Sequence, residues 1–190
     1  MSNLEIEYKT LLTKDEYQRL LRQMTHVNPI NQTNYYIDTP QFDLKANRMS
    51  LRIRTLPHQA ELTLKVPEKV GNREYNLSLT HEEAKEILKT CQLPQSDILD
   101  VIQNTGINSD DLINFGQLTT LRREETTAIG KMALDLNQYA TIVDYELELE
   151  VEDAESGEKA FYDFLEKNKI TFKYAKSKVA RFSQTLSHQK

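Results

Sequence analysis

Apolar and polar residues alternate through large parts of this chain, in short segments separated by turn residues. In the first segment, residues 4–9, apolar side chains take the even positions, and Glu5, Glu7 and Lys9 take the odd positions. A period of two is that of a β-strand with one face on a core. The same alternation predicts further strands over residues 32–39, 48–55, 61–65, 72–79, 116–126, 128–137 and 141–152.

Helical patterns occupy the remaining stretches. Thr13 to Glu16 and Thr80 to Glu83 are capping boxes, and apolar residues at helical spacing follow each of them. Shorter helical pieces are predicted over Asp97 to Asn104 and Asp110 to Asn114, and Ser156 is the expected cap of a last helix. The helices therefore fall into an inserted region at about residues 81–114 and two separate segments near the ends.

Seven or eight antiparallel strands joined by short turns predict an α+β fold built on a barrel or a strongly curved sheet. The helical stripes need an apolar partner, which the outer face of the strands supplies. The charged face of each strand then points inward. We expect one domain over residues 1–190, and the helical insertion either packs across the barrel or acts as a lid.

Composition narrows the class of protein. The chain has 190 residues, a hydrophobic fraction of 38%, a charged fraction of 28% and a net charge of −5, which argues against a general nucleic-acid surface. Cys91 is the only cysteine, so a disulfide within the chain and a thiolate zinc site are both excluded. The sequence has no membrane-spanning run, no leader pattern and no glycine-rich phosphate loop. We expect a cytoplasmic protein without a membrane partner.

Charged residues concentrate on one face of several strands. Glu5, Glu7 and Lys9 share a face of the first strand, and Arg52 and Arg54 share a face of another. Near residue 150, Glu146, Glu148 and Glu150 repeat the acidic pattern. Same-face neighbours on a strand lie roughly 6.5–7 Å apart, so paired carboxylates could hold a hard cation.

An interior with several acids needs compensating cations, because like charges out of water repel strongly. Lys9, Arg52, Arg54, Lys65 and Arg122 offer them. Phosphoryl or nucleotidyl transfer on a triphosphate requires such a combination of residues. Carboxylates bind Mg²⁺ or Mn²⁺, and neighbouring arginines bind phosphate oxygens. The alternative for Glu5 and Glu7 is an edge strand with a solvated charged face.

The opening Glu5-Ile6-Glu7-Tyr8-Lys9 matches the ExExK motif of the CYTH superfamily, the triphosphate tunnel metalloenzymes. Further blocks resemble this family in the same order along nearly the whole chain. They are Tyr35-Tyr36-Ile37-Asp38-Thr39, Leu51-Arg52-Ile53-Arg54, Leu62-Thr63-Leu64-Lys65, Arg73-Glu74, Leu121-Arg122-Arg123, Leu134-Asp135, Tyr145-Glu146-Leu147-Glu148 and Ser177-Lys178.

This resemblance implies an eight-stranded antiparallel β-barrel, a tunnel with helices packed outside, that binds a small-molecule triphosphate with Mg²⁺ or Mn²⁺. By motif, the expected metal ligands are Glu5, Glu7, Asp135, Glu146 and Glu148. The expected triphosphate-binding residues are Lys9, Arg52, Arg54, Lys65, Arg122 and Lys178, with Lys176 and Arg181 as alternatives to Lys178. Glu5, Glu7, Lys9, Arg52 and Arg54 are expected to carry catalysis.

Three functions fit these residues. The leading hypothesis is a metal-dependent hydrolase that releases orthophosphate from inorganic triphosphate or a small organic triphosphate. A class IV adenylyl cyclase, which makes cyclic AMP and pyrophosphate from ATP, is the second, and a non-catalytic polyphosphate or nucleotide binding module is the third. No motif identifies an adenine pocket, and the sequence predicts neither the organic group nor the oligomeric state.

Overall fold

A computed structural model describes residues 2–187 of the chain. Eight strands in this range form a closed barrel in the order β1-β5-β4-β3-β2-β6-β7-β8, which confirms the predicted antiparallel fold. The strands are β1 (Ser2–Leu12), β2 (Ile30–Asp38), β3 (Ser50–Thr55), β4 (Ala60–Pro67), β5 (Asn72–Leu79), β6 (Ile113–Thr127), β7 (Gly130–Tyr139) and β8 (Ile142–Val151). The helical elements are α1 (Lys14–Gln23), α2 (Asp43–Ala46), α3 (His81–Thr90), α4 (Asp97–Asn104), the short 3₁₀ helix η1 (Ser109–Asp111), α5 (Ala154–Lys167) and α6 (Lys178–Ser187).

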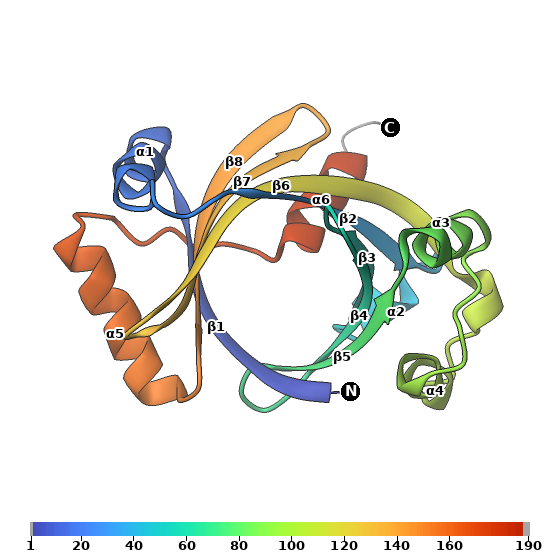
Figure 1. Ribbon diagram of the computed structural model, residues 1–190. Coiled ribbons are helices and arrows are strands. Elements are labelled where there is room, and N and C mark those ends of the chain that lie inside the picture. Colours follow the sequence, from blue (N-terminus) through green and yellow to red (C-terminus); the bar gives the residue numbers. More distant parts are fainter. Residues whose placement is uncertain (1, 188–190) are drawn as a thin grey trace. The chain divides into compact units, whose positions relative to one another are not determined.

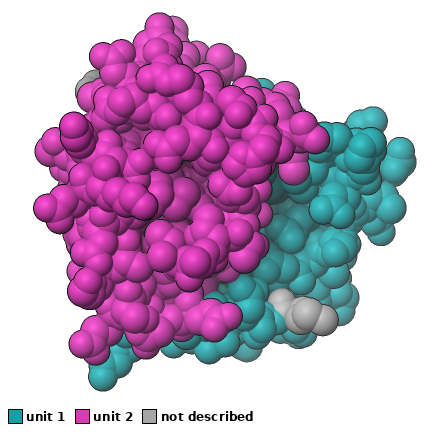
Figure 2. Space-filling view, turned by 60° about the vertical axis from the view of Figure 1, so that its left-hand side comes forward, with its two compact units in different colours: residues 1–4, 32–118 teal, residues 5–31, 119–190 magenta. Residues whose placement is uncertain are grey.

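The described chain divides into two compact units, coloured separately in Figure 2. One contains the described part of residues 1–4 together with residues 32–118, and the other contains residues 5–31 and the described part of residues 119–190. His188, to which the sequence assigns no chemistry, lies outside the described residues.

In the first unit, helices cover the apolar face of β3 and β4. Leu51 and Ile53 of β3 pack with Leu62 and Leu64 of β4, and all four are almost fully buried. Apolar residues of α2, α3 and α4 complete this core, and Figure 1 shows α3 and α4 on the same outer side of the strands. Alternation then places Arg52 and Arg54 on the opposite face of β3.

In the second unit, α1 and α5 cover β7 and β8 (Figure 1). Leu134, Leu147 and Leu149 form the strand side of this core. Gly157 allows α5 to approach β8 closely, since an added Cβ would lie 2.5 Å from a methyl carbon of Val151. The acidic residues of β8 consequently occupy the face opposite α1 and α5.

Two local predictions are wrong. The expected helical piece over Asp110 to Asn114 ends at Asp111, and β6 begins at Ile113. Asp153, and not Ser156, caps α5, because the Asp153 side chain accepts a hydrogen bond from the Ser156 amide. Both errors concern the ends of elements, where one or two residues decide the assignment. No helix within residues 2–187 is long and apolar enough to cross a membrane.

The two predicted capping boxes form, but in different surroundings. Glu16 is 7% exposed and accepts hydrogen bonds from the Thr13 amide at 2.7 Å and the Thr171 amide at 3.3 Å. The Lys173 ammonium lies 2.8 Å from the same carboxylate. Burial raises the pKa of Glu16, but Lys173 and the two amides outweigh burial and lower it overall. Glu83, in the second box, contacts only Thr80 among the described hydrogen bonds.

We predict that Glu16→Gln lowers the free energy of unfolding by about 1–3 kcal/mol at pH 7, because it weakens buried, charge-assisted hydrogen bonds. A lowered folded-state pKa means that the carboxylate stabilises the fold above its unfolded pKa of about 4.3 and loses this effect as the pH falls through the folded value. Urea unfolding from pH 7 to pH 3 should therefore show the deficit shrinking below about pH 4. The matched variant Glu83→Gln should lose less, and equal losses would contradict this account.

Candidate active site

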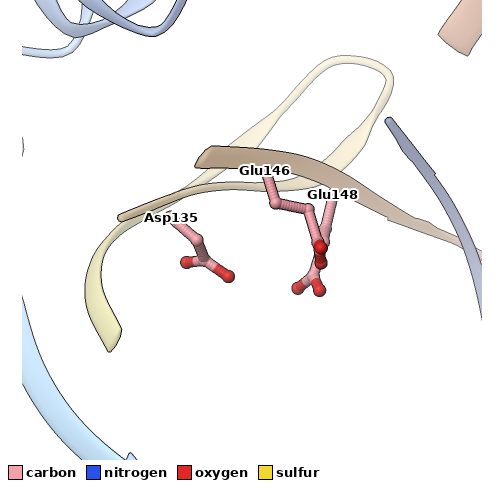
Figure 3. A group of neighbouring side chains, drawn as sticks. All are labelled: Asp135, Glu146 and Glu148. Atoms are coloured by element: carbon pink, nitrogen blue, oxygen red, sulfur yellow. The ribbon is translucent and has the colours of Figure 1, made fainter. Parts of the chain in front are cut away.

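Three carboxylates converge on the open face of β7 and β8. Asp135 of β7 pairs with Glu146 of β8 in the strand register, and Glu148 follows two residues later on the same face. One oxygen from each residue lies within 4.8 Å of the others, and Figure 3 shows the three side chains on the same side of the two strands. Asp135 and Glu146 are fully buried. The register of one hairpin is thus sufficient to build this carboxylate cluster.

Lys178, the first residue of α6, places its ammonium among all three carboxylates. Its Nζ lies 2.9 Å from Asp135 Oδ2, 2.7 Å from Glu146 Oε1 and 2.6 Å from Glu148 Oε1. The pKa of Lys178 is raised, because the three anions outweigh the effect of burial. The ammonium therefore stays charged and occupies the position that a cation bound by these oxygens would take.

Arg122 of β6 supplies the second cation. Its Nε donates to Asp135 Oδ1 at 2.8 Å and its Nη2 to Asp135 Oδ2 at 2.7 Å, which is a bidentate fork, and Nη2 also contacts Glu148. Arg122 is opposite Asp135 in the register of β6 and β7. Its guanidinium therefore joins the two acids that lie on either side of it.

Arg181 extends the cluster from the next turn of α6. Its guanidinium contacts Glu146 and lies 3.1 Å from Asp144 Oδ2. Lys176, the other alternative to Lys178, is exposed and contributes its carbonyl oxygen to Arg181. Both Lys178 and Arg181 therefore reach the acidic face. Their spacing of three residues along a helix was the available signal, but the sequence pattern did not predict that a helix begins at Lys178.

The pKa values of the two glutamates in the cluster are shifted in opposite directions. Burial raises the pKa of Glu146, and the negative charge of Glu148 adds to this although Lys178 opposes it. Burial acts on Glu148 as well, but Lys178 and Arg122 outweigh it and hold the pKa of that carboxyl well below its usual range. Glu148 is consequently kept in its charged form by its neighbours, whereas burial favours the protonated form of Glu146.

The donor set suits a hard divalent cation. Every candidate ligand atom in the cluster is a carboxylate oxygen, the type that Mg²⁺ and Mn²⁺ bind, and no thiolate or imidazole takes part. Ala133 stands opposite Glu148 on β7, so no large side chain is attached at that position. The residues present thus fit such an ion, provided that the Lys178 ammonium gives up its carboxylate contacts.

Glu5, Glu7 and Lys9 lie on β1, the neighbour of β8. Lys9 is opposite Glu148 and Glu7 is opposite Glu150, and Lys9 Nζ lies 2.6 Å from Glu7 Oε1. Burial lowers the pKa of Lys9, but Glu7 and Glu148 outweigh it and the net shift is upward. Glu5 and Glu7 are not members of the three-carboxylate group, so their role as metal ligands stays a prediction.

The first unit carries its own set of basic residues. Lys65 Nζ lies 3.0 Å from Glu74 Oε1, and an Arg52 nitrogen lies 4.0 Å from the same oxygen. Burial raises the pKa of Glu74, but Lys65 and Arg52 outweigh it and lower it overall. Arg54 Nε donates to Asn34 Oδ1 at 3.0 Å. The charge pattern of the sequence assigned no role to Glu74 or Asn34, although both lie on the polar face of an alternating strand, which was the available signal.

Known proteins resemble this chain over nearly its whole length. The model of the CYTH domain family matches residues 3–183. A protein of Bacillus subtilis (strain 168) named "Putative triphosphatase YjbK" is 35% identical over 183 residues, which cover 94% of each chain.

Solved structures show the same fold. A Bacillus halodurans crystal structure described as "a putative adenylate cyclase" shares 33% identity with a TM-score of 0.90, covering 95% of this chain and 98% of that one. The Hippeastrum protein HpAC1, described as a "putative adenylyl cyclase" with "dominant" triphosphatase activity, shares 24% identity with a TM-score of 0.83 over 96% of both chains. With a family match over nearly its entire length, the chain belongs to the CYTH domain family.

Proposed function

We propose that this protein is a divalent-metal-dependent phosphohydrolase that cleaves inorganic triphosphate or a small organic triphosphate and releases orthophosphate. The observation that carries this proposal is the cluster of Asp135, Glu146 and Glu148, whose oxygens converge beside two partly buried cations, Arg122 and Lys178. Acids and bases in such contact can exchange partners, the acids for a metal ion and the bases for phosphate oxygens. On a charged strand face exposed to solvent, Asp135 and Glu146 would not be fully buried.

Mg²⁺ or Mn²⁺ bound by the carboxylates would polarise phosphate oxygens and help to orient water toward the terminal phosphorus. The chain's own residues supply the remaining functions. Glu148 stays ionised beside Lys178 and Arg122, and these two cations turn from the carboxylates to the substrate's phosphate oxygens. Because the arginine fork presents two parallel donors, it stabilises the equatorial oxygens of the transferred phosphoryl group.

We further propose that Lys9, Arg52, Arg54 and Lys65 bind the phosphate chain and that Glu5 and Glu7 add metal ligands, as their match to the family motifs implies. The names of the relatives support hydrolysis but do not agree on the product. YjbK is named a triphosphatase, whereas the Bacillus halodurans protein, of similar identity, is named an adenylate cyclase. The leaving group therefore has to be identified by experiment.

Product analysis tests the reaction directly. We expect the purified protein, incubated with Mg²⁺ or Mn²⁺, to release orthophosphate from at least one of tripolyphosphate, thiamine triphosphate and ATP. Chelation of the metal should abolish the release. Cyclic AMP and pyrophosphate from ATP would replace hydrolysis with the cyclase reaction, and tight triphosphate binding without any product would favour a binding module.

Two matched substitutions on β8 test the carboxylate cluster. Glu148→Gln removes a charged ligand without changing size, and we expect orthophosphate release to fall by about 10²–10³, comparable to the loss of a preorganised charge-stabilising group. Glu150→Gln is the control, since Glu150 lies on the same face but is 35% exposed and pairs with Lys131. Manganese binding followed by electron paramagnetic resonance should weaken in the first variant only. Equal activity in the two variants would remove Glu148 from the site.

A further inference from the structure

Two carboxamides on β2 are buried with donors that have no partner. Asn34 is fully buried and Gln32 is 4% exposed, yet Asn34 Nδ2 and Gln32 Nε2 make no hydrogen bond within residues 2–187. Arg52 Nε, on the neighbouring strand β3, is also buried and unpartnered. Buried polar groups are paired in the great majority of cases, so three donors without partners on two neighbouring strands call for an explanation.

The orientation of the Asn34 amide follows from chemistry. Arg54 Nε can only donate, and it lies 3.0 Å from the Asn34 side-chain oxygen. The atom facing Arg54 must therefore be Oδ1, and Nδ2 is the group that points away from it. Exchanging the two amide atoms would leave two donors in contact. The donor group of Asn34 therefore faces away from Arg54 and has no hydrogen-bond partner among the described residues.

These donors share a face with the arginines. In the register of β2 and β3, Asn34 is opposite Arg54, and Tyr36 is opposite Arg52. Ile37 and Tyr35 take part in the helix-covered core, so Asn34 and Gln32 point to the other side of the strand. Gln32 lies one pleat repeat, roughly 6.5–7 Å, beyond Asn34. The result is a row of donors that starts at Arg52 and continues along β2.

The complementary ligand carries acceptors and few donors. Phosphoryl oxygens are of this kind, and a condensed phosphate chain presents them at successive positions. We propose that Asn34 Nδ2 and Gln32 Nε2 are substrate-binding donors, which take oxygens of the triphosphate next to the group held by Arg52 and Arg54. This inference rests on the proposed function and adds two neutral residues to the binding set.

A purely structural role for Asn34 makes a different prediction. If Asn34 only positions Arg54, Asn34→Asp preserves that role, because aspartate keeps the acceptor oxygen and adds charge to the contact. If Nδ2 binds substrate, the same change removes the donor and places a carboxylate oxygen against phosphate. Gln32→Met removes the second donor without adding charge and with little change in shape.

The experiment is calorimetric titration of tripolyphosphate into the full chain, without divalent metal and again with Ca²⁺, with orthophosphate assayed to correct for any turnover. We expect Asn34→Asp and Gln32→Met each to weaken binding about tenfold or more, the effect of losing a hydrogen bond to a charged group. In the Mg²⁺ assay KM should rise more than kcat falls.

Asn31→Asp is the matched control, because Asn31 is exposed on the same strand and the net charge changes by the same amount as in Asn34→Asp. It should bind within about twofold of the unaltered chain.

Arg52→Gln separates the two proposals. If Arg52→Gln weakens binding while Asn34→Asp and Gln32→Met bind normally, the carboxamides are not substrate donors and only this inference fails. If the unaltered chain does not bind tripolyphosphate, the proposed triphosphate site fails and this inference with it. Thermal unfolding of each variant identifies any loss that comes from misfolding, and Asn34→Ser provides a smaller uncharged change should Asn34→Asp fail to fold.

Discussion

The charge balance among Asp135, Glu146, Glu148, Lys178 and Arg122 is the interaction on which the site depends. Three carboxylates this close, two of them fully buried and the third partly buried, repel one another, and the free energy cost rises as water is excluded. The bidentate contact of Arg122 with Asp135 and the threefold contact of Lys178 offset that repulsion. Removing either cation alone would leave uncompensated charge, so the acids and bases have to be considered as one unit.

This balance is possible because α1 and α5 lie on the other side of β7 and β8, which leaves the acidic face to α6. Leu134, Leu147 and Leu149 pack against α1 and α5, and the residues between them in sequence face the opposite way. The same rule in the first unit places Leu51 and Ile53 in a core with the charges of β3 on the far face. Burying one face of each strand in a core therefore leaves the other face polar. In both units that polar face carries the charged residues of the candidate site.

The structure also changes the view of which polar residues matter. Charged residues attract attention in a sequence, whereas Asn34 and Gln32 read as ordinary strand residues. Both residues are buried, and their amide donors have no partner among the described residues. They are therefore candidates for ligand binding beside Arg52 and Arg54. Neutral donors can extend a phosphate site without adding to the repulsion among cations. Glu74 has the complementary effect of placing a negative charge near both Lys65 and Arg52.

The sequence by itself predicted the alternating strands and both capping boxes, because these depend on periods of two and 3.6 and on short-range hydrogen bonds. Periodicity left a barrel and a strongly curved sheet as alternatives, and the eight-stranded barrel was implied by the resemblance to the CYTH superfamily. The sequence also placed the acids and bases on particular faces. It did not determine that Asp135, Glu146 and Glu148 form one group, which follows from the register of β7 and β8. Nor did it show that α6 begins at Lys178 and delivers both Lys178 and Arg181 to the acids, or that Asn34 and Gln32 are buried with unpaired donors. Those facts depend on contacts between segments distant in sequence, and only the tertiary structure decides them.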